Sequence, residues 1–286
     1  MHFKKITFSV RGHLKTIELP CVAGILNLTS DSFYSGSRIT DENHMLKKAD
    51  KMIEEGAGIL DLGAVSTRPG AKLTNQKEEL SRLIPSLNLL RKEFPEILVS
   101  IDTFRSEVAR IAESEGADII NDISGGTMDN NMFAVVAELR LPYIMMHIKG
   151  TPENMQNNPQ YDNLLNDIND FFANRIKDAE HAGIHDIIID PGFGFGKTIA
   201  HNFELLAKLA LLAVHKKTVL AGISRKSMIY KTLGTTPENA LTGTIALNTV
   251  ALMNGANILR VHDVKEAVDT IQLVQNTLRN GENELT

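Results

Sequence analysis

Several features that mark large classes of proteins are scarce or absent in this sequence. The 286 residues include a single cysteine, Cys21, which excludes an internal disulfide framework and any cysteine-rich zinc site. No apolar run approaches the ~18 residues of a membrane-spanning helix, and residues 1–8 lack the apolar core of a secretory signal. Nine prolines and 20 glycines are too few for a disordered chain of this length. We therefore expect a folded cytoplasmic protein with Cys21 in its core.

An excess of positive charge is also missing. Lysine and arginine together number 30 against 35 acidic residues, which gives a formal net charge of −5, and no basic block stands out. Proteins that bind nucleic acids or anionic membranes are usually basic, at least locally. We therefore expect neither a nucleic-acid partner nor a membrane partner.

The length alone allows one large domain or two ordinary ones. Residues 1–20 differ from the rest, because alternating apolar residues flank a polar turn at 11–13, a pattern typical of a β-hairpin. No linker or change of composition interrupts the chain after residue 20. The expected organisation is a short N-terminal hairpin, residues 1–20, followed by one domain over residues 21–286.

From residue 21 onward, short apolar segments alternate with amphipathic ones. The apolar segments are 22–26, 59–62, 97–101, 118–120, 143–146, 187–189, 218–223 and 257–261. The amphipathic segments are 44–55, 76–93, 106–115, 131–139, 164–182, 202–214, 239–253 and 265–278. This alternation indicates an α/β fold with a parallel sheet covered on both faces. Eight units favour a (β/α)8 TIM barrel over the alternative, a doubly wound open sheet.

Polar residues follow each of the eight apolar segments. The carboxyl ends of barrel strands converge on one mouth, where such barrels place their active sites. A single strand-end Asp or Asn often does no more than cap the next helix. Eight polar strand ends together are better explained by a concave binding site.

Some of these strand-end residues carry positive charge or can acquire it. They are Arg68, Arg225, Lys226, Arg260 and His262. Arginine pairs with phosphate oxygens through two parallel hydrogen bonds, and the last loops of such barrels commonly hold phosphate. The alternative is that these side chains are solvated or paired with glutamate at the surface. We favour an anionic, phosphorylated substrate.

A second group of strand-end residues offers hydrogen-bond acceptors. They are Asp102, Asn121 and Asp190, and they suit a flat, nitrogen-rich ring whose N–H groups need acceptors. Lys226 could donate to a ring carbonyl, while Phe195 and Met145 could cover its faces. Met145 could equally be ordinary barrel core.

The glycine-rich segment 192–196 is followed by Lys197, which suggests a nucleotide phosphate loop. The spacing is one residue short of that motif, however, so the sequence does not support a nucleotide site there.

Together, the motifs resemble those of the dihydropteroate synthase family. The most specific are Ser-Thr-Arg-Pro-Gly at 66–70, Asp-Pro-Gly-Phe-Gly-Phe-Gly-Lys at 190–197, Ser-Arg-Lys-Ser at 224–227 and Arg-Val-His-Asp-Val at 260–264. The likeness covers 24–33, 61–71, 100–105, 117–126, 145–156, 189–197, 222–228 and 258–264, which is nearly the whole chain after residue 20.

This resemblance implies a reaction that joins p-aminobenzoate to 6-hydroxymethyl-7,8-dihydropterin diphosphate and releases pyrophosphate, in a family that is the target of sulfonamides. It also implies a homodimer. The family's pterin pocket corresponds to Asp102, Asn121, Asp190 and Lys226, with Met145, Phe195 and Gly222 around the ring. Its diphosphate site corresponds to Thr67, Arg68, Arg260 and His262, with Asn27 at Mg²⁺. Its aminobenzoate site corresponds to Pro69, Ser224, Phe195 and Lys226, with Arg225 nearby. Catalytic roles fall to Asp102, Lys226, Arg260 and His262.

The sequence departs from the family pattern at Ser30, where proline is usual, and at Ala64 and Val65, where Gly-Glu is more frequent. None of these is an expected ligand. We expect the loops 29–38 and 67–74 to close over the site. Two alternatives remain open: a methyltetrahydrofolate methyltransferase barrel, which needs no diphosphate clamp, and a protein that holds pterin without turnover.

Overall fold

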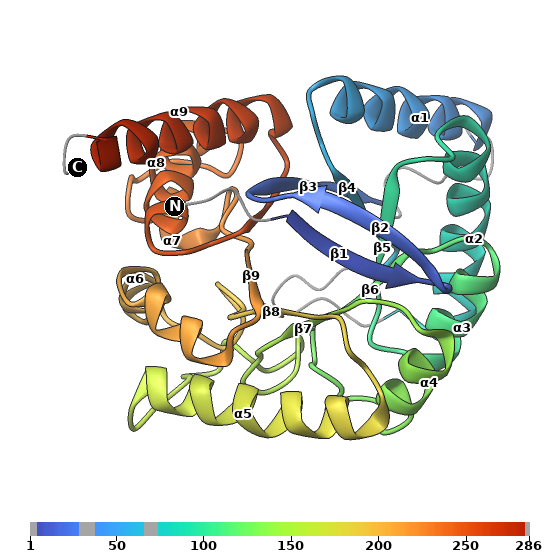
Figure 1. Cartoon of the computed structure of the whole chain (residues 1–286), viewed down its shortest axis with the longest axis horizontal. Coiled ribbons are helices and arrows are strands. Elements are labelled where there is room, and N and C mark those ends of the chain that lie inside the picture. Colours follow the sequence, from blue (N-terminus) through green and yellow to red (C-terminus); the bar gives the residue numbers. More distant parts are fainter. Residues whose placement is uncertain (1–4, 29–37, 66–73, 284–286) are drawn as a thin grey trace.

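The computed structural model describes residues 5–28, 38–65 and 74–283, and within these ranges the chain forms a closed barrel. Figure 1 shows the strands in the middle with the helices around them. The strands run in the closed order β10-β3-β4-β5-β6-β7-β8-β9, all parallel. They are β3 Cys21–Asn27, β4 Ile59–Gly63, β5 Leu98–Asp102, β6 Ile119–Asp122, β7 Tyr143–Met146, β8 Ile187–Asp190, β9 Thr218–Ala221 and β10 Ile258–Val261. The predicted (β/α)8 barrel is confirmed.

Nearly all strand residues are buried, because side chains on one face fill the barrel and those on the other pack under the helices. The register aligns the carboxyl ends of neighbouring strands. Gly63 of β4 is the Cα partner of Asp102, and Asp102 is in turn the partner of Asn121. Polar residues far apart in the sequence therefore share one end of the barrel.

The helices around the barrel begin and end largely at residues that local chemistry favours. They are α1 Arg38–Glu54, α2 Gln76–Glu93, α3 Ser106–Ser114, α4 Met132–Leu139, α5 Leu164–Ala182, α6 Ile199–Ala207, α7 Ser227–Tyr230, α8 Leu241–Met253 and α9 Val264–Asn283. Asn75 and Asn163 cap α2 and α5 through their side chains, and Gly183 ends α5 in the left-handed conformation. In contrast, Asp102, Asn121 and Asp190 do not cap the helices after them, whose N-caps are Arg105, Asn131 and Thr198.

The single helix expected over 202–214 is wrong. The chain forms α6 and then a 3₁₀ helix, η2 Leu209–His215, with a break at Lys208. A tertiary contact accompanies the break, because the side chain of Asn254 donates to the carbonyl of Leu206 at 2.8 Å. The short helix α7 was not predicted. Other differences are at helix ends: α1 begins at residue 38 rather than 44, and α9 extends to 283 rather than 278.

The N-terminal hairpin closes the amino end of the barrel. Strands β1 Lys5–Val10 and β2 His13–Glu18 pair antiparallel around Arg11 and Gly12, both with positive φ, as a two-residue type I′ turn requires. The hairpin crosses the barrel in Figure 1. The N–H of Ser9 donates to Asp186 at 2.7 Å, and Arg11 pairs with Asp118 at 2.9 Å, just before β8 and β6. The predicted hairpin is confirmed.

The hairpin shares the apolar core of the barrel, since Phe8 and Val10 are buried in the same cluster as the strands. Cys21 packs against that core, and burial raises the pKa of its thiol to about 12. The division at residue 20 stays a prediction. Among the described residues, no helix is both long and apolar enough to cross a membrane.

Candidate active site

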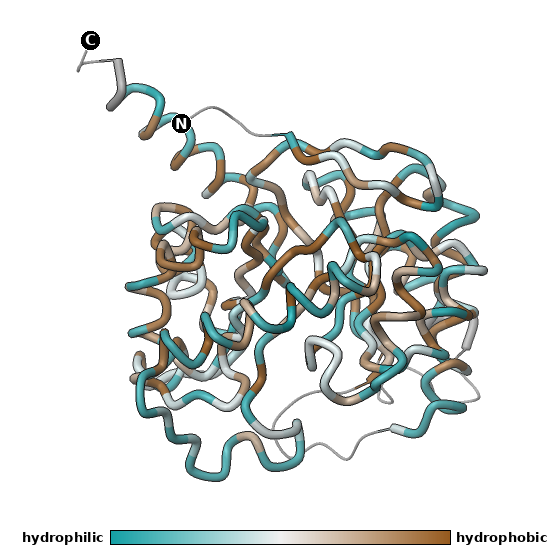
Figure 2. The backbone as a smooth tube through the Cα atoms, turned by 60° about the horizontal axis from the view of Figure 1, so that its bottom comes forward, coloured by the Kyte–Doolittle hydropathy of each residue, from teal (hydrophilic) through white to brown (hydrophobic). Residues whose placement is uncertain are grey.

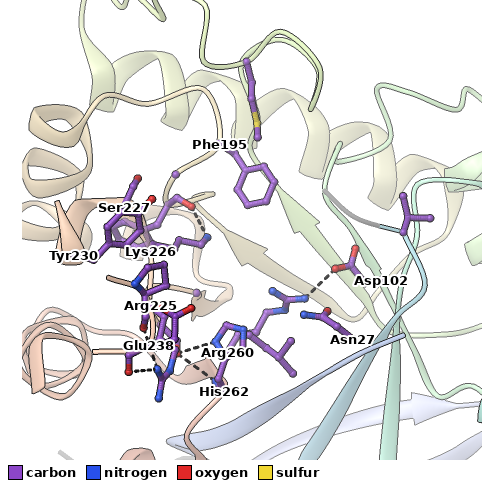
Figure 3. A pocket seen from close by; sticks show the side chains of 18 residues that line it. Asn27, Asp102, Phe195, Arg225, Lys226, Ser227, Tyr230, Glu238, Arg260 and His262 are labelled. Atoms are coloured by element: carbon purple, nitrogen blue, oxygen red, sulfur yellow. Dashed lines mark hydrogen bonds and ion pairs between the residues drawn. The ribbon is translucent and has the colours of Figure 1, made fainter. Parts of the chain in front are cut away.

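A pocket of about 520 Å³ opens at the carboxyl ends of the strands, opposite the hairpin. It is lined from β3, β5 and β10 and from the segments that follow β4, β7, β8, β9 and β10 (Figure 3). The lining residues include Asn27, Asp102, Phe195, Gly222, Ser224, Arg225, Lys226, Arg260 and His262. These nine strand-end residues were all predicted from the sequence, and the fold brings them together.

Arg260 lies at the centre of the inner part of this pocket. Its side chain points from β10 toward Asp102 in Figure 3. Nη2 donates to Asp102 Oδ2 at 2.9 Å, and Nε donates to Asp61 Oδ2 at 2.6 Å. Burial opposes the charge of the guanidinium, but the two carboxylates outweigh burial and raise its pKa above the ordinary value. The arginine stays charged between two acidic residues.

Asp102 is a carboxylate whose ionisation is opposed by burial. Burial raises its pKa to about 7, and the neighbouring acids Asp61, Glu79 and Asp122 add to this, while Arg260 opposes it. Its charge therefore depends on Arg260.

Asp61 was not among the predicted site residues, although it belongs to the same network. Asn121 Nδ2 donates to Asp61 Oδ1 at 3.1 Å, so Asp61 contacts both Asn121 and Arg260. The sequence did contain a signal for Asp61, since it is a charged residue inside an apolar strand segment. A buried carboxylate needs a partner, so such a position indicates a polar contact inside the barrel.

Lys226 and Asp190 lie close enough for each to influence the ionisation of the other. Lys226 Nζ donates to the carbonyl of Phe193 and lies 4.8 Å from the centre of the Phe195 ring. Burial lowers the pKa of Lys226 to about 8, while Asp190 and Asp102 raise it and Arg260 lowers it. Burial raises the pKa of Asp190, which accepts a hydrogen bond from the N–H of Gly192 at 2.8 Å.

His262 and Ser224 meet at the outer part of the pocket. Ser224 Oγ lies 3.1 Å from His262 Nδ1 and accepts from the His262 backbone N–H at 3.2 Å. Burial, followed by Arg260 and Lys48, lowers the pKa of His262 to about 4. At neutral pH the imidazole is uncharged and serves as a hydrogen-bonding group.

The guanidinium of Arg225 is engaged by protein rather than presented to the pocket. Nε and Nη2 donate to the two oxygens of Asp263, each at 2.8 Å, and Nη1 donates to the carbonyls of Pro237 and Glu238. Pro237 and Glu238 also line the pocket. This arrangement suits a residue that fixes the outer wall.

Asn121, Met145 and Asp190 do not line the pocket but are buried beside residues that do. Asn121 reaches the network of Arg260, and Asp190 acts on Lys226. Met145 is fully buried in β7. The predicted ligands Thr67, Arg68 and Pro69 lie outside the described residues, as do Ser30 and the greater part of both predicted closing loops.

The glycine-rich loop after β8 is wrapped around Lys197. Its Nζ contacts His147 Nδ1 at 2.9 Å and the carbonyls of Gly192 and Phe195 at 3.0 and 3.1 Å. Burial lowers the pKa of Lys197 to about 7. The lysine thus supports the loop from within, consistent with the failed match to a nucleotide phosphate loop.

Known proteins resemble this chain in sequence and in fold. Residues 23–262 match the model of the pterin binding enzyme family. The dihydropteroate synthase of Escherichia coli strain K12 is 42% identical over 266 residues, which cover 92% of this chain and 94% of that protein. The dihydropteroate synthase of a Synechocystis strain is 44% identical over 260 residues, covering 90% and 89%.

Solved structures agree with these matches. A Yersinia pestis dihydropteroate synthase with a sulfonamide drug complex has a TM-score of 0.89 and 39% identity, covering 96% of this chain and all of that one. A Xanthomonas albilineans dihydropteroate synthase with 4-aminobenzoic acid has a TM-score of 0.88 and 38% identity, covering 96% and 99%. The chain therefore belongs to the dihydropteroate synthase family of pterin-binding enzymes.

Proposed function

We propose that this chain condenses p-aminobenzoate with 6-hydroxymethyl-7,8-dihydropterin diphosphate to give 7,8-dihydropteroate and pyrophosphate, a step of folate biosynthesis. One observation carries the proposal: a buried set of acceptors, including Asp102, Asn121 and Asp190, adjoins Lys226, Arg260 and His262 at one barrel mouth. A pterin has N–H groups and a carbonyl on its edge, and the diphosphate needs cationic and hydrogen-bonding groups beside it.

Each group has a role that its geometry suits. Asp190 and Asn121 accept hydrogen bonds from the pterin, and Lys226 donates to the ring carbonyl. Arg260 and His262 bind the diphosphate. Ser224 and Phe195 also line the pocket, and in this proposal they contact the aminobenzoate.

The reaction needs charge stabilisation more than proton transfer. The C–O bond between the pterin methylene and the diphosphate breaks, and the electron pair leaves with the diphosphate oxygen, where Arg260 stabilises it. The lone pair of the aniline nitrogen forms the new C–N bond, and that nitrogen then releases a proton to solvent. Asp102, 2.9 Å from Arg260, stabilises the positive charge that develops on the methylene.

Mg²⁺ is part of the proposal. Asn27 lines the pocket at the end of β3, and the neighbouring Gly63 has no side chain to fill the space between Asn27 and Asp102. The side-chain oxygen of Asn27, beside Asp102, suits a hard cation such as Mg²⁺. Most of the other ligands of the ion would be water molecules and phosphate oxygens. Among the described residues, no group of three or more His, Cys, Asp or Glu side chains forms a metal cage. When bound, the ion would offset the charge of the leaving diphosphate.

The homodimer and the cytoplasmic location also stay proposals. Exposed apolar side chains on η2, α8 and α9 support a dimer, since unpaired apolar surface favours association. They are Leu211, Val214, Val250, Met253 and Leu273. Helices α6, α8 and α9 lie on the same side of the barrel in Figure 1. The molar mass measured by light scattering tests the dimer.

The function is tested by pyrophosphate release. We expect release only with both substrates and Mg²⁺, and inhibition by a sulfonamide that p-aminobenzoate relieves. Pterin binding without release would favour a protein that holds pterin without turnover. Methyl transfer from methyltetrahydrofolate would favour the methyltransferase alternative.

A further inference from the structure

Asp61 occupies a position inside the barrel that links two parts of the site. It lies in the middle of β4, with 1% of its surface exposed, and it does not line the pocket. Its partners come from two other strands: Arg260 from β10 at 2.6 Å and Asn121 from β6 at 3.1 Å. Alternate strands of such barrels contribute side chains to shared interior layers, which explains why residues so distant in sequence meet.

We propose that Asp61 is a positioning residue that fixes the amide of Asn121, so that Asn121 offers its carbonyl oxygen, and not its NH2 group, to the pterin. The proposal rests on the proposed function for the identity of the ligand. Asp61 touches no substrate in it, and acts through Asn121 and Arg260.

The orientation of Asn121 follows from the chemistry of its partner. An amide can present either end, whereas an ionised carboxylate can only accept. Both oxygens of Asp61 lie within reach of Asn121 Nδ2, at 3.1 and 3.3 Å. The NH2 group therefore faces Asp61, and Oδ1, on the other branch of the planar amide, is left for a ligand N–H.

Arg260 is the second partner of Asp61. The guanidinium donates Nε to Asp61 and Nη2 to Asp102, so one buried cation joins the two carboxylates. A hydrogen bond between a charged donor and a carboxylate is stronger than one between neutral groups, so this contact fixes the position of the Asp61 carboxyl group. Asp61 therefore holds Asn121 on one side and the plane of Arg260 on the other.

The substitution Asp61→Asn tests this because it keeps the size of the side chain, replaces one acceptor by a donor and removes one negative charge beside Arg260. The new Oδ1 can still accept from Arg260, but the new Nδ2 would face the NH2 of Asn121. The amide of Asn121 then rotates by half a turn and presents its NH2 group to the pterin, which also presents an N–H donor at that position. We expect the affinity for 6-hydroxymethylpterin, measured by calorimetry, to fall about 10- to 100-fold, the usual range for a mispaired group in a binding site.

The reciprocal exchange provides the rescue. Asn121→Asp alone places two carboxylates side by side and should also weaken pterin binding. In the double variant Asp61→Asn with Asn121→Asp, the amide at 61 donates to the carboxylate at 121, whose other oxygen again accepts from the pterin. We expect the double variant to bind at least about fivefold more tightly than either single variant, a non-additivity typical of direct partners.

Two controls separate positioning from structural damage. Asp118→Asn makes the same change in a buried aspartate paired with Arg91 and Arg11 at the opposite end of the barrel, and it should leave pterin affinity unchanged. The KM for p-aminobenzoate should change less than about twofold in Asp61→Asn, because that substrate contacts other residues.

The proposal is overturned if Asp61→Asn binds 6-hydroxymethylpterin within twofold of the wild type, or if the double variant binds no better than the single variants. The proposed function can fail separately from this proposal. If the wild-type chain binds pterin but releases no pyrophosphate, the proposed reaction is refuted, and the role of Asp61 in pterin binding can still be measured. Wild-type chain that binds no pterin refutes both.

Discussion

Arg260 connects two subsites that the sequence presented as separate. The acceptors for the ring and the cations for the diphosphate come from different motifs, yet the guanidinium lies against Asp61 and Asp102. Asn121 is held by the same Asp61. A change at Arg260 must therefore be felt at the ring as well as at the diphosphate.

Arg260→Ala should weaken the binding of both 6-hydroxymethylpterin and pyrophosphate. It removes the cation from two buried carboxylates, and the pKa of Asp102 then rises further, since Arg260 is the group that lowers it. Calorimetry with each ligand measures this, and a loss of about 10-fold or more for each is expected. His262→Ala is the comparison, which should affect pyrophosphate alone. Unchanged pterin affinity in Arg260→Ala would refute the link between the subsites.

The lowered pKa of Lys226 predicts that enzyme activity falls at alkaline pH. Its pKa is lowered from 10.5 to about 8, and only the ammonium form donates to the pterin carbonyl. The competent form is therefore complete below this pKa and is lost as the pH rises through it, so kcat/KM for the pterin substrate should fall about tenfold per unit above pH 8.

Lys226→Arg should move this alkaline loss to higher pH, whatever its activity at neutral pH, because arginine stays protonated. If kcat/KM of the wild type stays constant up to pH 10, deprotonation of Lys226 does not limit the activity at alkaline pH.

At the scale of elements, the loop after β8 shows how backbone conformation supports the site. Gly192 has a φ of +70°, and a Cβ there would overlap the carbonyl of His147. The N–H of Gly192 holds Asp190, and its carbonyl accepts from Lys197. Strand β8 thus places Asp190, and the glycine conformation lets the following loop fold back over it.

Gly192→Ala should destabilise the fold more than a matched change elsewhere. Gly234 has a similar φ of +62° but open space around its Cα, so Gly234→Ala should cost only the left-handed strain of about 1–2 kcal/mol. Gly192→Ala adds a steric overlap of about 1–3 kcal/mol. Urea unfolding of the two variants measures the difference. Equal losses would mean that the loop relaxes around the added methyl group.

At the scale of the whole molecule, the two ends of the barrel have different tasks. The hairpin seals the amino end and buries Phe8 completely, while the pocket occupies the other end. Figure 2 shows the tube of the barrel from the side, with apolar stretches concentrated in its interior and α9 projecting at one corner. Substitutions at the amino end of the barrel should therefore affect stability, and substitutions at the pocket should affect binding.

Phe8→Ala should lower the free energy of unfolding by about 3–5 kcal/mol, the usual cost of removing a buried phenylalanine. Both KM values should stay unchanged at temperatures where the variant is folded, because the pocket is at the far end. Leu14→Ala, at a hairpin position that is 77% exposed, is the control and should have little effect. Denaturant unfolding and steady-state kinetics check this. A raised KM in Phe8→Ala would show that the two ends are coupled.

The sequence by itself determined the barrel, because short apolar segments that alternate with amphipathic ones can bury both faces of a sheet in few other ways. It also determined that Asp102, Lys226 and Arg260 would share a mouth, since each lies at or shortly after the carboxyl end of a predicted parallel strand. The tertiary structure alone decided which of these side chains pair. Asp61 was hidden inside an apolar segment, and the donors of Arg225 turned to Asp263. Such pairings depend on distances between strands that are far apart in the chain, and residue order does not encode these distances locally.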